Sequence, residues 1–198
     1  MLQAALEKRS ALIRGFADED TNSYRIFNGE TDGRSGLTVD QYGTLVLIES
    51  FREPLLEPDL AQIEAFCATA VPNHTVIYND RSNGNLHIAN PLPPALLTEA
   101  MLPREAREFG VAYRMQGRHL AHAALLDLEL RAMRRQVMKD AVGKTVLSVF
   151  SHTCSPGIAA AKSGASFVVN VDANEYALSI GKESARMNSL PVRPRFIK

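Results

Sequence analysis

Hydrophobic positions near the start of the chain follow a helical period and then a strand-like one. Apolar residues recur at helical spacing over 2–16, with Leu12 on the expected buried face, which predicts an amphipathic helix. Over 21–50, short runs rich in Val, Ile, Leu and Thr are separated by pairs ending in glycine, such as Tyr42-Gly43. This pattern is typical of strands joined by tight turns, so it predicts a small β region after the first helix.

The next segments predict a second helix and further strands. Residues 57–70 return to helical periodicity with acids in the first turn, and two runs, 74–80 and 85–90, indicate a strand pair. The segment 91–97 (PLPPALL) predicts a loop or linker, because proline lacks a backbone donor. A hairpin around Phe109-Gly110 should follow. We expect a domain boundary just after this hairpin, with a small α+β domain over 1–116 and a second domain over 117–198.

Beyond residue 117 the pattern alternates between helix and strand. Residues 123–140 read as a helix whose basic residues face outward, and a strand (145–150), a helix, a strand, a helix and the start of a third strand follow. Alternation of this kind predicts a parallel sheet. The predicted fold class is therefore α/β: a small N-terminal α+β domain followed by an incomplete Rossmann-like parallel sheet. The outward basic residues are Arg131, Arg134, Arg135 and Lys139.

Composition narrows the class of protein. Basic and acidic residues balance at 22 each, which argues against a protein that holds nucleic acid by bulk positive charge alone. No apolar run approaches the roughly 20 residues that span a bilayer, so we expect a cytoplasmic chain without a membrane partner. Cys67 and Cys154 fit no metal spacing, and His119 and His122 have no completing ligand nearby, so we expect no metal site.

The turn between the strand at 145–150 and its helix is the predicted ligand site, because ligands of doubly wound folds bind beyond the carboxyl ends of the strands. Ser155 is positioned to cap the helix and Pro156 to occupy its first position. Asp172 ends the next strand about twenty residues on, where an acid can bind ribose hydroxyls. The turn FSHTCSPG has no G-x-G-x-x-G, which disfavours a dinucleotide reductase and favours a ribose cofactor without a pyrophosphate cradle, such as S-adenosylmethionine.

Three segments resemble one known family. TNSYRIFNGETDGRSGLTVDQYG (21–43), LLDLELRAMRR (125–135) and VLSVFSHTCSPGIAAAKSGASFVVNVDANEYALSIGKESARMNSL (146–190) are similar to class I methyltransferases of large-subunit ribosomal RNA, including those that modify the 5-position of cytosine. The family usually carries an RNA-binding PUA domain, a small α/β domain and the methyltransferase domain. The resemblance implies that the PUA domain is absent here.

The resemblance also implies roles for particular residues. S-adenosylmethionine is the implied cofactor and ribosomal RNA the implied partner. Asn188 matches a helix-end residue of the family, and Asp127 matches the acid of its Leu-Asp-Gln-Arg motif, although Asp127 could instead pair with Arg131. Arg131 and Arg135 are candidate RNA contacts, although a solvated helix face is the commoner reading of such charges. The implied cofactor residues are Ser148, Phe150, Ser151, Thr153, Asp172 and Asn174.

Departures from the family pattern set the remaining expectations. Cys154 and Ser155 replace two glycines of the family. We expect Cys154 to be a packing residue rather than a nucleophile, because no partner base is evident for it except His152. The catalytic residues would lie in strands after Lys198, which makes the chain truncated or degenerate. Only the strand order 3-2-1 could form, leaving 145–150 as an unprotected edge and a route to a homo-oligomer. The alternative is a non-catalytic RNA-binding or assembly module.

Overall fold

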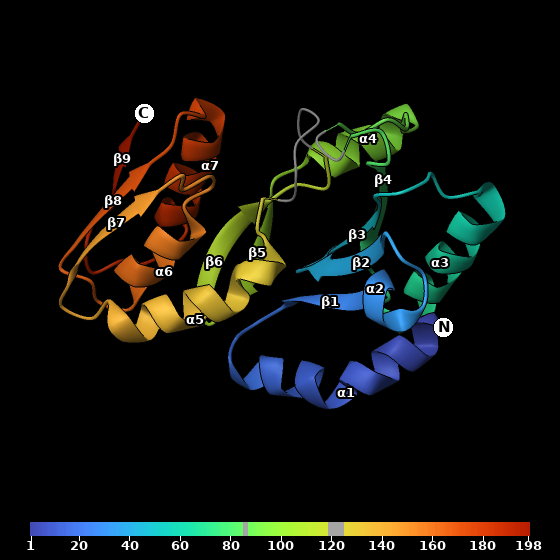
Figure 1. The fold of residues 1–198 in the computed structure, drawn as a ribbon, viewed down its shortest axis with the longest axis horizontal. Helices are drawn as coiled ribbons and strands as arrows, with labels where there is room; N and C mark the ends of the chain where they lie inside the picture. The colour runs from blue at the N-terminus through green and yellow to red at the C-terminus, as the bar shows by residue number, and fades with distance from the viewer. Residues whose placement is uncertain (85–86, 119–124) are drawn as a thin grey trace. The chain divides into compact units, whose positions relative to one another are not determined.

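The computed structural model describes residues 1–84, 87–118 and 125–198, which form two compact units (Figure 1). The N-terminal unit comprises Met1–Arg104 and the segment that starts at Met115. The C-terminal unit comprises Glu105–Arg114 and Leu125–Lys198. The β hairpin predicted around Phe109-Gly110 forms, and its tip groups with the C-terminal unit. The predicted boundary near residue 117 concerns domains that fold independently, which is a different property from compactness, so it stays a prediction.

The N-terminal unit is a four-stranded mixed sheet with helices packed on it. The strands lie in the order β1-β2-β3-β4, where β1, β2 and β3 are antiparallel and β4 is parallel to β3. The turn at Gly43, which has a φ of +59°, joins β2 to β3 as predicted. The elements are α1 (Leu2–Asp18), β1 (Ser23–Asn28), α2 (Gly29–Asp32), β2 (Leu37–Tyr42), β3 (Leu45–Ser50), α3 (Glu57–Ala70), β4 (Thr75–Asp80) and α4 (Pro94–Met101).

The core of the N-terminal unit forms where apolar residues of α1 and α3 meet the sheet. Leu2 and Ala5 of α1 and Cys67 of α3 belong to one buried cluster with residues of β1, β2 and β3. Both predicted helices are therefore confirmed. Leu12 departs from the predicted buried face, because 60% of its surface is exposed.

Two predictions for the N-terminal unit were wrong in part. Residues 87–90 form no strand, so the pair expected for 74–80 and 85–90 does not form in the described part, while residues 85 and 86 lie outside it. The segment 91–97 is only partly a loop, because α4 starts at Pro94. Proline is tolerated in the first turn of a helix, since the backbone N–H that it lacks would have no helical acceptor there.

None of the described helices is long and apolar enough to cross a membrane.

The C-terminal unit is a three-stranded parallel sheet with a hairpin and helices beside it. The strands lie in the order β7-β8-β9, as predicted for the first half of a Rossmann-like sheet. Helices α6 and α7 form the crossovers and lie on one face of this sheet (Figure 1), as right-handed connections require. The elements are β5 (Arg104–Glu108), β6 (Val111–Met115), η1 (Leu128–Leu130), α5 (Arg131–Asp140), β7 (Thr145–Val149), α6 (Ser155–Lys162), β8 (Phe167–Val171), α7 (Glu175–Arg186) and β9 (Arg195–Ile197).

A buried ionic cluster ties the hairpin to α5. Glu108 and Arg134 are fully buried, and Arg134 Nε donates to Glu108 Oε2 at 2.6 Å. Arg131 Nε donates to the other carboxylate oxygen at 2.5 Å. The prediction that Arg134 faces outward was therefore wrong. The helical pattern indicated which residues share a face but gave no sign that a buried acid from the distant hairpin lay opposite Arg134.

We predict that Glu108→Ala destabilises the protein by about 3–5 kcal/mol, because it leaves the buried Arg134 cation unpaired. Arg131→Ala should cost about 2 kcal/mol or less, since Glu108 keeps its bonds to Arg134. Replacing both buried partners, Glu108→Leu with Arg134→Met, should recover much of the loss. Urea unfolding of the variants measures these differences. Equal losses for Glu108→Ala and Arg131→Ala would contradict the assignment.

Candidate functional site

The turn after β7 has an unusual backbone for a segment without glycine. Phe150, His152 and Cys154 have φ values of +52°, +47° and +63°, so three side-chain-bearing residues adopt the left-handed region in alternation. Each such residue costs of order 1–3 kcal/mol and persists only where its surroundings hold it. The contacts that hold this turn therefore define the site.

Asp172 provides one of these contacts. It directly follows β8, as predicted, and its Oδ2 accepts the backbone N–H of His152 at 2.7 Å. Its Oδ1 accepts the N–H of Asn174 at 2.8 Å. The side chain is only partly buried. A carboxylate has about four acceptor positions, so Asp172 can bind two further donors while it holds the turn.

Two predicted cofactor residues anchor the turn through their hydroxyls. Thr153 Oγ1 donates to the carbonyl of Leu125 at 2.5 Å, and the Ser151 hydroxyl lies 3.4 Å from the sulfur of Cys154. Both side chains are almost fully buried. Ser151 and Thr153 can therefore position the backbone of the turn, whereas the neighbouring Phe150 is 92% exposed.

The two residues that replace family glycines pack inward. Cys154 is fully buried, and its sulfur lies so close to Gly181 that a Cβ there would approach it to 2.7 Å. The Ser155 hydroxyl accepts a bond from Arg134 Nη1 at 3.4 Å. The prediction that Ser155 caps α6 was wrong, because Cys154 holds the N-cap position and Ser155 is the first helical residue.

A cavity of about 640 Å³ opens beside the turn and β7. Four predicted cofactor residues line it together: Ser148, Phe150, Ser151 and Thr153. Asp127 lines it too, and its Oδ1 accepts the N–H of Glu129 at 2.9 Å, so it caps η1 while Arg131 binds Glu108. Asp172 and Asn174 do not line the cavity. The structure therefore brings the predicted residues to one end of the sheet in two groups: those that line the cavity, and Asp172 with Asn174. The hydrogen bond from the backbone N–H of His152 to Asp172 joins the two groups.

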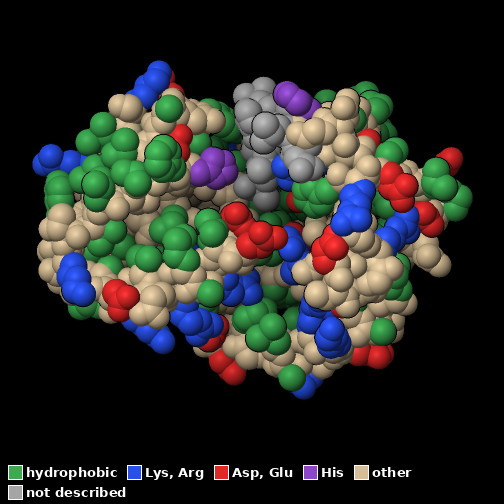
Figure 2. Space-filling model, viewed as in Figure 1, with side chains coloured by type: hydrophobic (Ala, Val, Ile, Leu, Met, Phe, Trp, Pro, Cys, Tyr) green, Lys and Arg blue, Asp and Glu red, His purple; other side chains and the backbone are tan. Residues whose placement is uncertain are grey.

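Exposed apolar side chains surround this cavity. Among the described strands β7 pairs with β8 alone, so its other edge has no partner strand. Leu147 and Val149 of β7 are 65% and 55% exposed, and Leu130 and Met133 extend the apolar lining. Figure 2 shows hydrophobic side chains gathered over the part of the molecule that holds β7. This surface has the apolar character of an interior rather than of an ordinary solvated face.

Asparagines fix the two ends of α7. The Asn174 side chain accepts the N–H of Ala177 at 3.1 Å and so caps the first turn. At the other end, Asn188 exchanges two hydrogen bonds with the backbone of Ala112 in β6, at 3.0 and 2.8 Å. Asn174 is exposed beside Asp172, whereas the amide of Asn188 is used within the fold.

The two predicted RNA contacts on α5 already have protein partners. Arg131 binds Glu108, and the guanidinium of Arg135 lies 4.3 Å from the ring centre of Phe109. Arg135 remains exposed. No cluster of His, Cys, Asp and Glu suited to a metal occurs in the ranges that the structure describes, and His119 and His122 lie outside those ranges.

Sequence reasoning overlooked Glu108 and a second cavity lined by Lys182, Arg186 and Arg193. Glu108 gave no signal in the sequence, because the hairpin and α5 are distant along the chain. The second cavity did leave a signal in the sequence: Lys182 and Arg186 lie four residues apart on one helix, and like charges at that spacing repel each other.

Comparisons with known proteins agree with this geometry. A family model described as S-adenosylmethionine-dependent methyltransferase matches residues 34–194, so the chain belongs to that family. S-adenosylmethionine is the family's cofactor.

Individual relatives add detail. A protein of Aeromonas salmonicida (strain A449) named Ribosomal RNA large subunit methyltransferase I is 28% identical, over 96% of this chain and 48% of its own length. A Streptococcus mutans structure described as a SAM-dependent methyltransferase is 25% identical with a TM-score of 0.78, covering 99% of this chain and 50% of that one. A methyltransferase structure with bound SAH has the same identity and TM-score. The chain spans about half the length of the curated relatives it matches.

The residues present fit the adenosyl cofactor. Asp172 retains acceptor capacity at the tip of β8, where ribose hydroxyls are recognised in Rossmann-like sheets. Cys154, which replaces one family glycine, is buried against Gly181 and does not line the cavity beside β7, whereas Ser155, which replaces the other, does line it.

We predict that Cys154 is unreactive in the native protein. Burial raises the pKa of its thiol to about 11, with Asp172 adding to the shift and Ser151 opposing it. Because the thiolate is the reactive form, at pH 8 only about one molecule in a thousand is reactive, and the rate should rise about tenfold per pH unit up to pH 11.

Labelling with a disulfide reagent checks this in a Cys67→Ala variant, which leaves Cys154 as the single thiol. The native protein should label far more slowly than the urea-unfolded chain. Labelling at pH 8 as fast as that of a free thiol would instead indicate a thiolate activated by the helix N-terminus.

Proposed function

We propose that this chain forms the cofactor-binding part of an S-adenosylmethionine-dependent methyltransferase that modifies large-subunit ribosomal RNA. The observation that carries the proposal is the position of Asp172, which holds the turn after β7 and keeps acceptor positions for a ribose. Support also comes from the family match and from relatives named as ribosomal RNA large subunit methyltransferases.

In this proposal each part of the site has a distinct role. The cofactor supplies an electrophilic methyl group when bound. Asp172 accepts the ribose hydroxyls, and Ser151 and Thr153 keep the turn in its left-handed conformation through their buried hydroxyls. Ser148 and Phe150 line the cavity beside the turn, where the exposed ring of Phe150 can cover a bound ligand.

The finer expectations stay predictions. The resemblance favours the 5-position of a cytosine as the target, with catalytic residues supplied by strands that follow β9 in the family. RNA contact by Arg131 and Arg135, a cytoplasmic location and a homo-oligomer formed through the free edge of β7 also belong to this proposal. The exposed apolar residues beside β7 support the last of these, because an unpaired, apolar strand edge favours association.

Calorimetric titration with S-adenosylhomocysteine tests the proposal. The chain should bind with micromolar affinity, and Asp172→Asn should weaken binding by about tenfold or more, because it removes a charged acceptor for the ribose hydroxyls. Asp140→Asn, a change at an exposed carboxylate at the end of α5, is the matched control and should bind like the unchanged chain.

Two results would contradict the proposal. Equal affinities for Asp172→Asn and Asp140→Asn would show that Asp172 does not hold the cofactor. A chain that binds single-stranded RNA but no S-adenosylhomocysteine would favour a non-catalytic RNA-binding module. Circular dichroism of each variant shows whether the fold is retained.

A further inference from the structure

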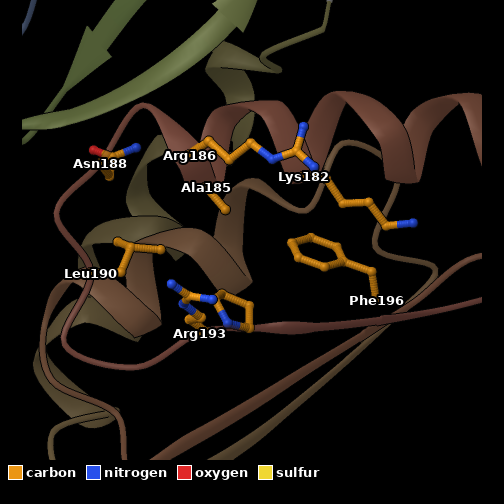
Figure 3. Close-up of a pocket in the computed structure, with 8 residues that line it drawn as sticks. Lys182, Ala185, Arg186, Asn188, Leu190, Arg193 and Phe196 are labelled. Atoms are coloured by element: carbon orange, nitrogen blue, oxygen red, sulfur yellow. The ribbon is translucent and has the colours of Figure 1, made fainter.

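A second cavity of the C-terminal unit lies between α7 and β9 and has a different chemistry from the first. Its volume is about 570 Å³. In Figure 3, Lys182 and Arg186 project from α7, Arg193 comes from the segment before β9, and the ring of Phe196 faces the helix from the strand. Leu190 and Pro194 complete its apolar part. We call these residues the basic pocket.

The three cations of the basic pocket are not neutralised by the protein. No described residue forms an ion pair or side-chain hydrogen bond with Lys182, Arg186 or Arg193, and no acid lines the pocket. Cations nearby are engaged: Lys198 lies 3.2 Å from Glu175, and Arg195 stacks on the ring of Phe167 at 4.9 Å. Three cations without an ion-pair partner therefore meet at this pocket, although the chain as a whole is neutral.

This arrangement costs stability unless a ligand compensates it. Lys182 and Arg186 are four residues apart on α7, where like charges repel. Glu183, the acid between them, forms an ion pair with Arg114 instead. Three cations around a partly exposed aromatic ring are suited to a phosphate group that carries a planar base, because phosphates pair with Lys and Arg while bases stack on aromatic rings.

We propose that the basic pocket binds a single-stranded segment of RNA, with phosphates at Lys182, Arg186 and Arg193 and a base against Phe196. The inference rests on the proposed function, because ribosomal RNA is the substrate class proposed for this chain. It places an RNA contact outside the cavity beside β7, since the two cavities share no lining residue and Asp172 lines neither of them.

The chemistry favours RNA over an acidic peptide. An acidic peptide would use the three cations and leave the ring of Phe196 without a specific partner, whereas every nucleotide provides both an anion and an aromatic face. The side-chain amide of Asn188 also lines the pocket, but it is bonded to Ala112 and Ser184 and so is committed to the fold. The pocket therefore offers charge and stacking without an amide for base reading, and we expect little sequence preference.

Fluorescence anisotropy with a short, labelled single-stranded RNA tests the proposal on the full chain. Lys182→Gln with Arg186→Gln should weaken binding by roughly tenfold to thirtyfold at about 0.1 M salt, and should lower the slope of log affinity against log salt by about 1.4, or about 0.7 per phosphate contact. Phe196→Leu keeps an apolar side chain and should weaken binding about fivefold or more through lost stacking.

The control is Arg14→Gln with Lys144→Gln, which removes the same charge from two exposed residues outside the pocket. It should leave both affinity and salt slope nearly unchanged. Absence of RNA binding by the unchanged chain, or equal effects of the pocket and control pairs, would overturn the inference. So would RNA binding that ignores the pocket variants while an acidic peptide competes for the pocket.

Titration of the same variants with S-adenosylhomocysteine separates this inference from the proposed function. If the inference is correct, the pocket variants bind S-adenosylhomocysteine like the unchanged chain and lose only RNA. Failure of the unchanged chain to bind S-adenosylhomocysteine would overturn the proposed function, whereas RNA binding unaffected by the pocket variants would overturn the inference alone.

Discussion

The hydrogen bond from the backbone of His152 to Asp172 links the tips of β7 and β8, and the candidate site depends on it. The turn it secures contains three left-handed residues without glycine, which an unsupported chain would not retain. One carboxylate thus stabilises the turn and presents acceptors to a ligand. The same residue serves the fold and the proposed cofactor contact, so changes at Asp172 affect both.

Burial explains how the site tolerates its departures from the family pattern. Where the family has two glycines, Cys154 packs against Gly181 and Ser155 bonds to Arg134, which is held by Glu108. The hairpin, α5 and the turn after β7 therefore form one buried polar network. Because Glu108 and Arg134 are fully buried, this network links the geometry of the turn to a hairpin residue more than forty residues earlier in the chain.

Local pattern predicted much of this architecture. Periodicity located α1, α3 and the alternating elements from β7 to β9, and the spacing from the turn to Asp172 predicted the tip of β8. Contacts between distant segments could not be read in this way: the burial of Arg134 depends on Glu108 of the hairpin, and the charge of the basic pocket depends on which cations lack a partner. Pro94 shows why residue propensity alone was insufficient: proline disrupts the interior of a helix but is tolerated in its first turn, where α4 begins.

The most direct test of the central claim is a crystal structure of the chain with S-adenosylhomocysteine. The account predicts that the adenosyl group lies beyond the carboxyl ends of β7 and β8, with both ribose hydroxyls donating to Asp172 and with the His152 bond retained. An adenosyl group bound in the basic pocket beside Phe196, or at the sheet without contact to Asp172, would contradict it.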